Sequence, residues 1–454
     1  MRAAWPLIGS HRMDDRTSGS DQGCASHDHA TSDAKPRNIA DIPSWDVDPA
    51  TPLYRIRPIA LLFTTRVMSN VTNHMITVAV GYQVYDLTES ASLLGLIGLA
   101  QFLPPLLLML FAGQVSDRFN RRQVLRICYA IELCAAAGFL ALALLPRPNI
   151  AAMFLLVFIN ATARTFELPA VAALMPLMAP RAVLGRAIAA HVSAGKLSML
   201  IGPSLGGVLY LFGPYVVYGV CVLTILIAWA ASFLLPRPPD PMGPAKMSLD
   251  TLLGGFRFIW RSQTLLGAMS LDLVATLFGG LQALLPIYAR DILDIGALGA
   301  GVLRSSPAVG ALLAAAVLTR IPIRRHAGIY MYVGVVVYGV SAIVFAFSHD
   351  VLLSVTALIL FGAGDMVSAV VRQTLMQVTT PDEMRGRVSA VSSLFASTSD
   401  QLGWFRAGMM AAWLGPVGSV AIGGAAAIAT VVLWTWRFPV LRRVQRPDEP
   451  YIGS

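Results

Sequence analysis

Several polar and ionisable side chains stand inside long apolar stretches of this 454-residue sequence. A charged group in hydrocarbon costs about 2.5–3.5 kcal/mol even on the mildest scale, so such residues are rarely accidental. The chemistry open to them is proton binding, ion pairing and contact with a polar ligand. The residues that we predict to form a substrate or proton pathway are Arg66, Asn70, His74, Arg164, Glu167, Asp272, Asp365 and Asp400.

Helical spacing brings many of these residues onto common faces. On the stretch 55–83, positions 66, 70, 73, 74 and 77 form one polar stripe. Arg164 and Glu167 share a second stripe with Asn160, and Asp365 shares a third with Ser368. Asp400 belongs to a serine-rich stripe near the C-terminus. We therefore expect the polar side chains to gather on a few helix faces inside an apolar bundle.

The composition defines the elements that carry these stripes. Only 13% of the residues are charged and 56% are hydrophobic, whereas a soluble domain has about 25% charged and 45–50% apolar residues. This excludes a secreted, disulfide-rich or disordered protein and argues against a soluble multidomain enzyme. Apolar runs long enough to span a bilayer recur throughout, and the fold class that we predict is an all-α polytopic membrane protein with twelve transmembrane helices. The predicted spans are 55–83, 91–115, 122–145, 149–178, 184–211, 215–235, 264–290, 297–319, 328–347, 351–378, 386–412 and 415–437.

The chain divides into five parts by composition. Residues 1–52 are polar and predict a disordered cytoplasmic tail, with Met13 as an alternative start. An N-terminal six-helix half (53–235) and a C-terminal half (263–440) flank a proline-rich linker, 236–262, whose second part is typical of an amphipathic surface helix. Residues 441–454 form a short tail. Of the bases near the predicted membrane ends, fifteen fall in one set of loops and two, Arg147 and Arg290, in the other.

The positive-inside rule places the base-rich loops, and with them both termini, in the cytoplasm. The net charge of +9 is thus explained by topology, and nucleic acid is not expected as a partner. The four cysteines lack metal-ligand spacing, so no metal site is predicted.

The two halves share an internal repeat. At a shift of 201 residues, 174–189 aligns with 375–390 and six positions are identical. The same shift, without a gap, also matches Ser198, Gly202 and Gly207, so nine identities include one proline and three glycines. Two parallel six-helix repeats are the layout of a transporter whose substrate site lies between them near the middle of the membrane. The same shift places Arg164 on Asp365, and a shift of 206 places Arg66 on Asp272. Opposite charges at equivalent positions would be able to pair across the central cavity.

A charged loop in the first half carries a recognisable motif. It runs Gly113-Gln114-Val115-Ser116-Asp117-Arg118-Phe119-Asn120-Arg121-Arg122 and resembles the signature loop of the major facilitator superfamily. The resemblance, which covers residues 53–440, implies that Gly113, Asp117, Arg118, Arg121 and Arg122 form a cytoplasmic gate that holds the two halves together in one conformation. The equivalent second-half loop, 321–325, keeps its bases but lacks the acid.

A glycine-proline segment in the fifth span supports export. Gly202, Pro203, Gly206 and Gly207 resemble the motif found in exporters of this superfamily, although close helix packing would also explain small residues there. Stretches at 254–258, 285–290 and 380–388 resemble the branch that contains the bacterial enterobactin exporter and macrolide efflux proteins.

Together these features predict a secondary active exporter of a small amphipathic molecule, a drug-like compound or a siderophore, in the bacterial inner membrane. We expect it to act as a monomer without a cofactor, driven by proton antiport, with Glu167, Asp365, Asp272 or Asp400 binding the proton and His74 as a rival. Static ion pairs are the alternative role for these residues. An importer or facilitated carrier of the same fold, or a non-transporting receptor or scaffold, remains open. Enzyme motifs and a nucleotide-binding loop are missing from the sequence.

Overall fold

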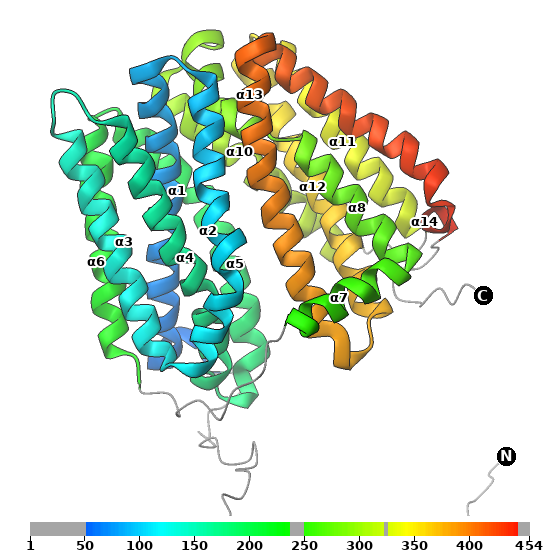
Figure 1. Ribbon diagram of the computed structural model, residues 1–454, viewed down its shortest axis with the longest axis horizontal. Helices are drawn as coiled ribbons and strands as arrows, with labels where there is room; N and C mark the ends of the chain where they lie inside the picture. The colour runs from blue at the N-terminus through cyan, green and yellow to red at the C-terminus, as the bar shows by residue number, and fades with distance from the viewer. Residues whose placement is uncertain (1–50, 237–248, 322–325, 444–454) are drawn as a thin grey trace, which may run out of the picture. The chain divides into compact units, whose positions relative to one another are not determined.

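The computed structural model describes residues 51–236, 249–321 and 326–443, and the described chain is helical almost throughout (Figure 1). The predicted tail at 1–50, the proline-rich part of the linker and the last residues of the C-terminal tail lie outside the described residues. The helices of the first half are α1 (Arg57–Thr88), α2 (Ala91–Arg118), α3 (Arg121–Ala143), α4 (Ile150–Met178), α5 (Leu184–Tyr210) and α6 (Pro214–Leu234). Those of the rest are α7 (Leu249–Arg261), α8 (Gln263–Phe278), α9 (Leu285–Ile287), α10 (Gly296–Arg320), α11 (Ala327–Phe347), α12 (Val351–Thr379), α13 (Asp382–Arg437) and α14 (Pro439–Arg443).

Within the described residues, ten helical stretches are long and apolar enough to cross a membrane. The chain is therefore a multi-pass membrane protein. The number twelve stays a prediction, because it requires α13 to count as two spans and α1 to count as one. Gly415, with φ 76° and ψ 164°, breaks α13 into two arms. The asparagines and Arg66 on α1 keep it out of the apolar set, which is a consequence of the polar stripe it carries.

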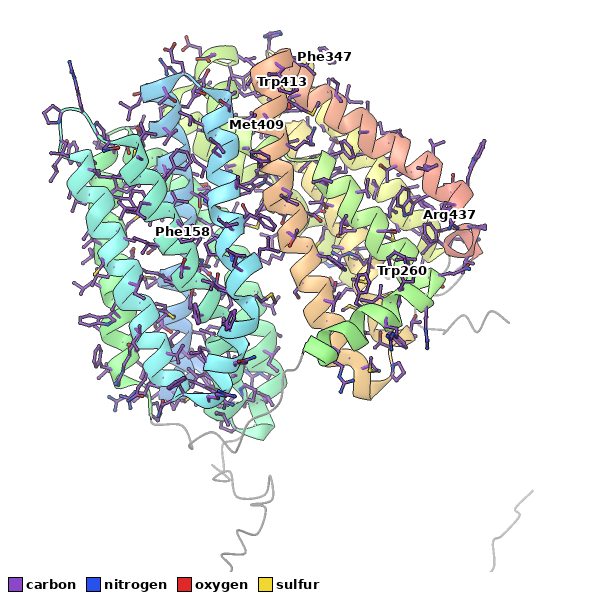
Figure 2. The ribbon with its side chains drawn as sticks, viewed as in Figure 1. Phe158, Trp260, Phe347, Met409, Trp413 and Arg437 are labelled. Atoms are coloured by element: carbon purple, nitrogen blue, oxygen red, sulfur yellow. The ribbon has the colours of Figure 1, made fainter. Side chains whose placement is uncertain are left out.

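Exposed aromatic side chains mark the two ends of the helical bundle (Figure 2). Trp413 is 82% exposed and lies with Phe347 at the end shown uppermost. Trp260, 63% exposed, lies lower in the same view. Tryptophan is favoured at membrane–water interfaces, so the positions fit a bilayer between these two levels. We call the lower level, where α6 ends and α7 begins, the linker end, and the upper level the far end.

The linker helix α7 packs on the second half. Ile259 is 3% exposed and packs in one cluster with residues of α8, α12 and α13, while Phe256 and Trp260 stay exposed. One apolar face against the bundle and aromatic residues beside it agree with the amphipathic pattern of this segment. The helix runs across the lower part of the second half in Figure 1.

Two seams of small residues join the halves at the far end. In one, α2 contacts α13, and a Cβ added to Gly408 would lie 2.4 Å from the Cα of Gly95. In the other, α5 contacts α10, and a Cβ added to Gly301 would lie 3.0 Å from the Cα of Gly207. Only glycine allows backbones to approach so closely. The α2 and α13 ribbons are nearest to each other at the upper end of Figure 1, as these contacts require.

Candidate functional site

A buried charged network lies between α1, α3 and α4. We call it the first-half node; it consists of Arg66, Ser69, Glu132, Arg164 and Glu167. Arg66 donates a hydrogen bond from one guanidinium nitrogen to Oε1 of Glu167 at 3.0 Å. Arg164 lies 3.4 Å from Oε2 of the same carboxylate. The Glu167 side chain is completely buried, whereas the two arginines are 13% and 16% exposed. Both arginines therefore contact the buried Glu167 while part of each arginine side chain stays accessible.

The hydroxyl of Ser69 lies between two carboxylates. Its oxygen is 3.1 Å from Oε1 of Glu167 and 3.2 Å from Oε2 of Glu132. Arg164 donates to the same hydroxyl oxygen at 3.1 Å. Glu132 is only 2% exposed, and its Oε1 has no hydrogen-bond partner among the described residues. Glu132 was not among the predicted pathway residues, since nothing in a single helix shows that its side chain points toward this network.

The polar stripe of α1 extends from the node toward the far end. Arg164 donates its second hydrogen bond to Oδ1 of Asn70 at 3.0 Å, and Asn160 donates to Oδ1 of Asn73 at 3.2 Å. His74 lies one turn further on, against α5, where a Cβ added to Gly202 would be 2.5 Å from the His74 Cβ. The predicted residues of α1 and α4 thus come together as one continuous site.

The second half holds a different set of groups at the corresponding depth. We call it the second-half node: Asp272, Tyr338, Asp365, Ser368 and Arg372. Arg372 pairs with Asp272 at 3.2 Å, and these side chains are 13% and 11% exposed. A pocket of about 200 Å³, including its open mouth, is lined by both aspartates, Tyr338 and Ser368. The Ser368 hydroxyl is buried and has no partner among the described residues. Asp365 is exposed to solvent.

Asp400 on α13 is also exposed and lies outside the ion pairs of the described residues. It belongs with Asp365 to a set of accessible carboxylates on the second half, and Lys196 of α5 is an accessible base on the first.

The expected pairing of charges across the cavity is not what the structure shows. Each ion pair of the two nodes lies within one half: Glu167 with Arg66 and Arg164, and Asp272 with Arg372. The physical reason is distance, since each arginine reaches an acid on its own helix or on a packed neighbouring helix without crossing an opening. Arg372, which is not among the predicted pathway residues, is the partner of Asp272.

The predicted gate residues make contacts inside the first half in this conformation. Arg122 and Arg126 of α3 donate to the carbonyl oxygens of Ser232 and Phe233 at the C-terminal end of α6. Cations are favoured there because the last carbonyls of a helix carry partial negative charge. Arg121 donates to the carbonyl oxygen of Ser116 at 3.3 Å.

The rest of that loop contributes less to the described contacts. Gly113 is half-buried and Arg118 is exposed, while the side chain of Asp117 lies outside the described residues. The loop residues are therefore placed at the linker end of α2 and α3, and their role as a gate stays a prediction.

The glycine-proline segment of α5 contacts two neighbouring helices. Gly206 packs on the backbone of Met75 in α1, and Gly207 packs on Gly301 in α10. The carbonyl oxygen of Pro203 is 2.6 Å from the position that a Cβ on Gly301 would occupy. This segment therefore forms one of the two seams between the halves.

An ion cluster that sequence analysis did not find joins the halves at the far end. Arg290 lies 3.4 Å from Asp86 and 3.1 Å from Glu89, both from the first half. Tyr85 of α1 donates a hydrogen bond to Asp291. We call these five residues the far-end latch. Arg290 was expected only to mark a loop, and its partners follow from the folding of the second half against the first.

A second pocket lies just below this latch. It has an empty volume of about 410 Å³, including its opening, and its lining includes Thr77, Gln282, Arg304 and Trp404. The Arg304 guanidinium lies 4.6 Å from the Trp404 ring centroid and donates to the carbonyl oxygen of Gln282 at 3.0 Å. A cation on an aromatic face, surrounded by apolar walls, suits contact with an amphipathic molecule.

A family model confirms the resemblance of the signature loop. The model described as Major Facilitator Superfamily matches residues 62–405. The chain belongs to the major facilitator superfamily. Its helical halves, the seams between them and the two polar nodes are therefore parts of a membrane transporter, and the chain is not an enzyme.

The most informative relatives within the superfamily are exporters. "Enterobactin exporter EntS" of Citrobacter koseri is 29% identical over 394 residues, which cover 85% of this chain and 93% of the relative. The protein of the same name from Shigella boydii serotype 4 is 28% identical over 401 residues, or 87% of this chain and 94% of the relative. The predicted likeness to the siderophore exporter branch is confirmed.

Solved structures support the major facilitator fold. A bacterial homologue of the human lysosomal transporter Spinster, described as inward-facing and unoccupied, aligns with a TM-score of 0.67 at 15% identity, over 87% of this chain and 97% of that one. A POT family transporter in complex with 5-aminolevulinic acid aligns with a TM-score of 0.68 at 13% identity, over 85% of this chain and 96% of that one. At such identities the likeness concerns the fold alone.

Proposed function

We propose that this protein exports a small amphipathic molecule, of the drug-like or siderophore class, by proton-coupled antiport across the bacterial inner membrane. The observation that carries the proposal is the pair of polar nodes: acids and arginines sit deep in an otherwise apolar bundle, at corresponding places in two repeats. Groups placed there at such cost are suited to bind a proton and a polar part of a substrate.

The seams and the far-end latch support an alternating-access cycle. The halves are joined at the far end by Gly95–Gly408, by Gly207–Gly301 and by Arg290. With both termini in the cytoplasm, as the loop charges indicate, this conformation opens toward the cytoplasm. The substrate then enters from the cytoplasm and leaves after the seams part.

The gate loop is proposed to act in the opposite conformation. Arg118, Arg121 and Asp117 stand at the linker end, where the halves must meet when the far end opens. Arg122 already anchors α3 to α6, so the first half moves as one packed unit.

The pocket at Arg304 and Trp404 supports an amphipathic substrate that carries a polar or anionic group beside an aromatic or apolar one. The names of the EntS relatives favour a siderophore as that molecule. An importer of the same fold is the second candidate, and the direction of transport decides between them.

The test is uptake of enterobactin into everted membrane vesicles under an imposed pH gradient. An exporter accumulates the siderophore in such vesicles when their interior is acidic, and collapsing the gradient with a protonophore stops it. If Glu167→Gln, Asp272→Asn, Asp365→Asn and Asp400→Asn all leave gradient-driven uptake intact, the proton-coupling proposal is wrong. Uptake only into right-side-out vesicles would favour the importer. A host strain lacking the gene, tested for siderophore retention and antibiotic sensitivity, tests the cargo class.

A further inference from the structure

The hydrogen bonds of Ser69 do not balance unless the first-half node contains one additional proton. A hydroxyl has one hydrogen to donate and two lone pairs to accept. The Ser69 oxygen has three contacts: a donated N–H from Arg164 and two carboxylate oxygens, at 3.1 and 3.2 Å. Its single hydrogen satisfies one carboxylate contact. The other contact joins two oxygens, and without a hydrogen between them it would be repulsive.

The location of the missing hydrogen follows from the cations. Glu167 contacts both Arg66 and Arg164, and it also accepts from the Tyr129 hydroxyl at 3.3 Å, so it is held as the carboxylate. Glu132 has no arginine within ion-pair distance among the described residues. It is almost completely buried, and a buried carboxylate without a cation is costly. The hydrogen therefore belongs to Glu132, whose O–H donates to Ser69, while the Ser69 hydroxyl donates to Glu167.

Among the described residues, the cations that act on Glu132 are the two arginines that already pair with Glu167. On its own helix, Cys128 and Tyr129 are the nearest titratable side chains. From α1 the node receives Arg66, and from α4 it receives Arg164 and Glu167. The sequence of α6, Pro214–Leu234, has no Asp, Glu, Lys, Arg or His, and the charges of α2 are at its linker end, in Asp117 and Arg118.

We propose that Glu132 is the residue that carries the coupling proton of this transporter, and that Ser69 relays the proton between Glu132 and Glu167. This inference rests on the proposed function. In the relay, the Glu132 O–H bond breaks as a new O–H bond forms on Ser69, and the original Ser69 O–H bond breaks as one forms on Glu167. One proton moves, and no other reactant is consumed.

Glu167 connects the relay to the accessible part of the site. Its two arginines are partly exposed and also hold Asn70 and Ser69 in place. When the proton reaches Glu167, that acid becomes neutral and no longer holds Arg66 and Arg164, which are then free to turn toward the opening between the halves. Proton transfer inside the first half thereby leaves Arg66 and Arg164 as unpaired positive charges at the surface that faces the second half.

The first experiment is infrared difference spectroscopy of the purified full-length protein, with pH and H/D exchange as the only probes. The wild type is expected to show the C=O stretch of a protonated carboxylic acid near neutral pH. Glu132→Gln is expected to remove this band, whereas Glu89→Gln, the control at an exposed acid of the far end, keeps it. A band that is absent from the wild type, or unchanged in Glu132→Gln, overturns the proposal. Should Glu132→Gln fail to fold, Ser69→Ala removes no charge and is expected to shift the band; an unshifted band then overturns the proposal.

The second experiment separates a coupling role from a structural one. In everted vesicles, Glu132→Gln is expected to lose enterobactin accumulation driven by a pH gradient but to keep exchange of labelled enterobactin without a gradient. A merely structural residue would lower both together, and that result overturns the coupling role. If the wild type moves enterobactin regardless of the gradient, the proposed function fails, and the coupling role with it. The infrared band still decides whether Glu132 holds a proton.

Discussion

The two nodes occupy equivalent places in the repeat but are built from different chemistry. Shifts of 201 and 206 residues align the first-half node with the second: Arg66 with Asp272, Ser69 with Ala275, Glu132 with Tyr338, Arg164 with Asp365, and Glu167 with Ser368. In the first half, long side chains fill the space and form several ion pairs and hydrogen bonds with one another. In the second, shorter ones leave a pocket that keeps an unpartnered serine hydroxyl. Pseudo-symmetry has preserved the position of the polar site while the two copies have acquired different contacts.

This difference suggests a division of labour. A buried, hydrogen-bonded network can hold a proton at a defined atom, as proposed for Glu132. A pocket that reaches an exposed aspartate, Asp365, can accept a small group from outside. Breaking the two nodes should therefore give unequal results.

The largest effect is expected from removing the shared acid of the first-half node. Glu167→Gln leaves Arg66 and Arg164 buried without a carboxylate, and breaking a buried pair costs about 3–5 kcal/mol. An arginine does not lose its proton, so both side chains stay charged after the change. Thermal unfolding of the purified protein in detergent measures the loss, with Glu89→Gln as the control, because Glu89 is an exposed acid at the far end.

Removing the base of the second-half node is expected to cost less than removing the acid of the first. Arg372→Gln leaves Asp272 without its arginine, but a carboxylate can take up a proton and become neutral. The remaining cost is that of an imperfectly satisfied polar group, about 1–3 kcal/mol. Equal losses for Glu167→Gln and Arg372→Gln would show that the two nodes are energetically alike, and would contradict the comparison.

Valine substitutions in the two glycine seams test whether the two contacts between the halves are equally strong, in contrast to the two nodes. Gly408→Val and Gly301→Val each force a side chain into a backbone contact at the far end. Overpacking of this kind costs about 1–3 kcal/mol. It destabilises only the conformation in which the seam is closed. Both variants are therefore expected to favour a far-end-open conformation to a similar degree.

The readout for the seams is labelling of a cysteine introduced at Thr77, which lines the pocket below the latch. In a cysteine-free background, an impermeant maleimide applied from the far-end side should react faster in both seam variants. Gly219→Val is the control, since a Cβ at Gly219 meets nothing within 4 Å. Faster labelling in only one seam variant would mean that one interface opens first.

The sequence was sufficient for the parts of the site that lie along one helix. Arg164 and Glu167 were placed on one stripe by their spacing, and the structure joins them as an ion pair. The family followed from the loop around Asp117, because its motif is local. The stripe on α1 was also correct in composition, since helical periodicity alone brings Arg66 and Asn70 together.

The contacts between helices could not be predicted in the same way. Glu132 stands alone on its helix, and only the packing of α3 against α1 and α4 shows that Ser69 is its partner. Arg372 was not predicted as the partner of Asp272, because its reach toward Asp272 depends on the rotation of α12. Pairing within a half rather than across the cavity depends on the separation of the halves, which a periodic pattern does not encode.

The smallest effect, and the finest test of the comparison, comes from the aligned pair Ser69 and Ala275. Ser69→Ala removes a hydroxyl that contacts Arg164 and both glutamates, and leaving buried polar groups unsatisfied costs about 1–3 kcal/mol. Ala275→Ser adds a hydroxyl beside a pocket, where a helical serine can bond to the carbonyl oxygen one turn earlier. We expect a change within about 0.5 kcal/mol there. Unfolding temperatures measured side by side decide the point: a large loss from Ala275→Ser would mean that the second-half node is as tightly packed as the first, and that its pocket does not accept an added polar group.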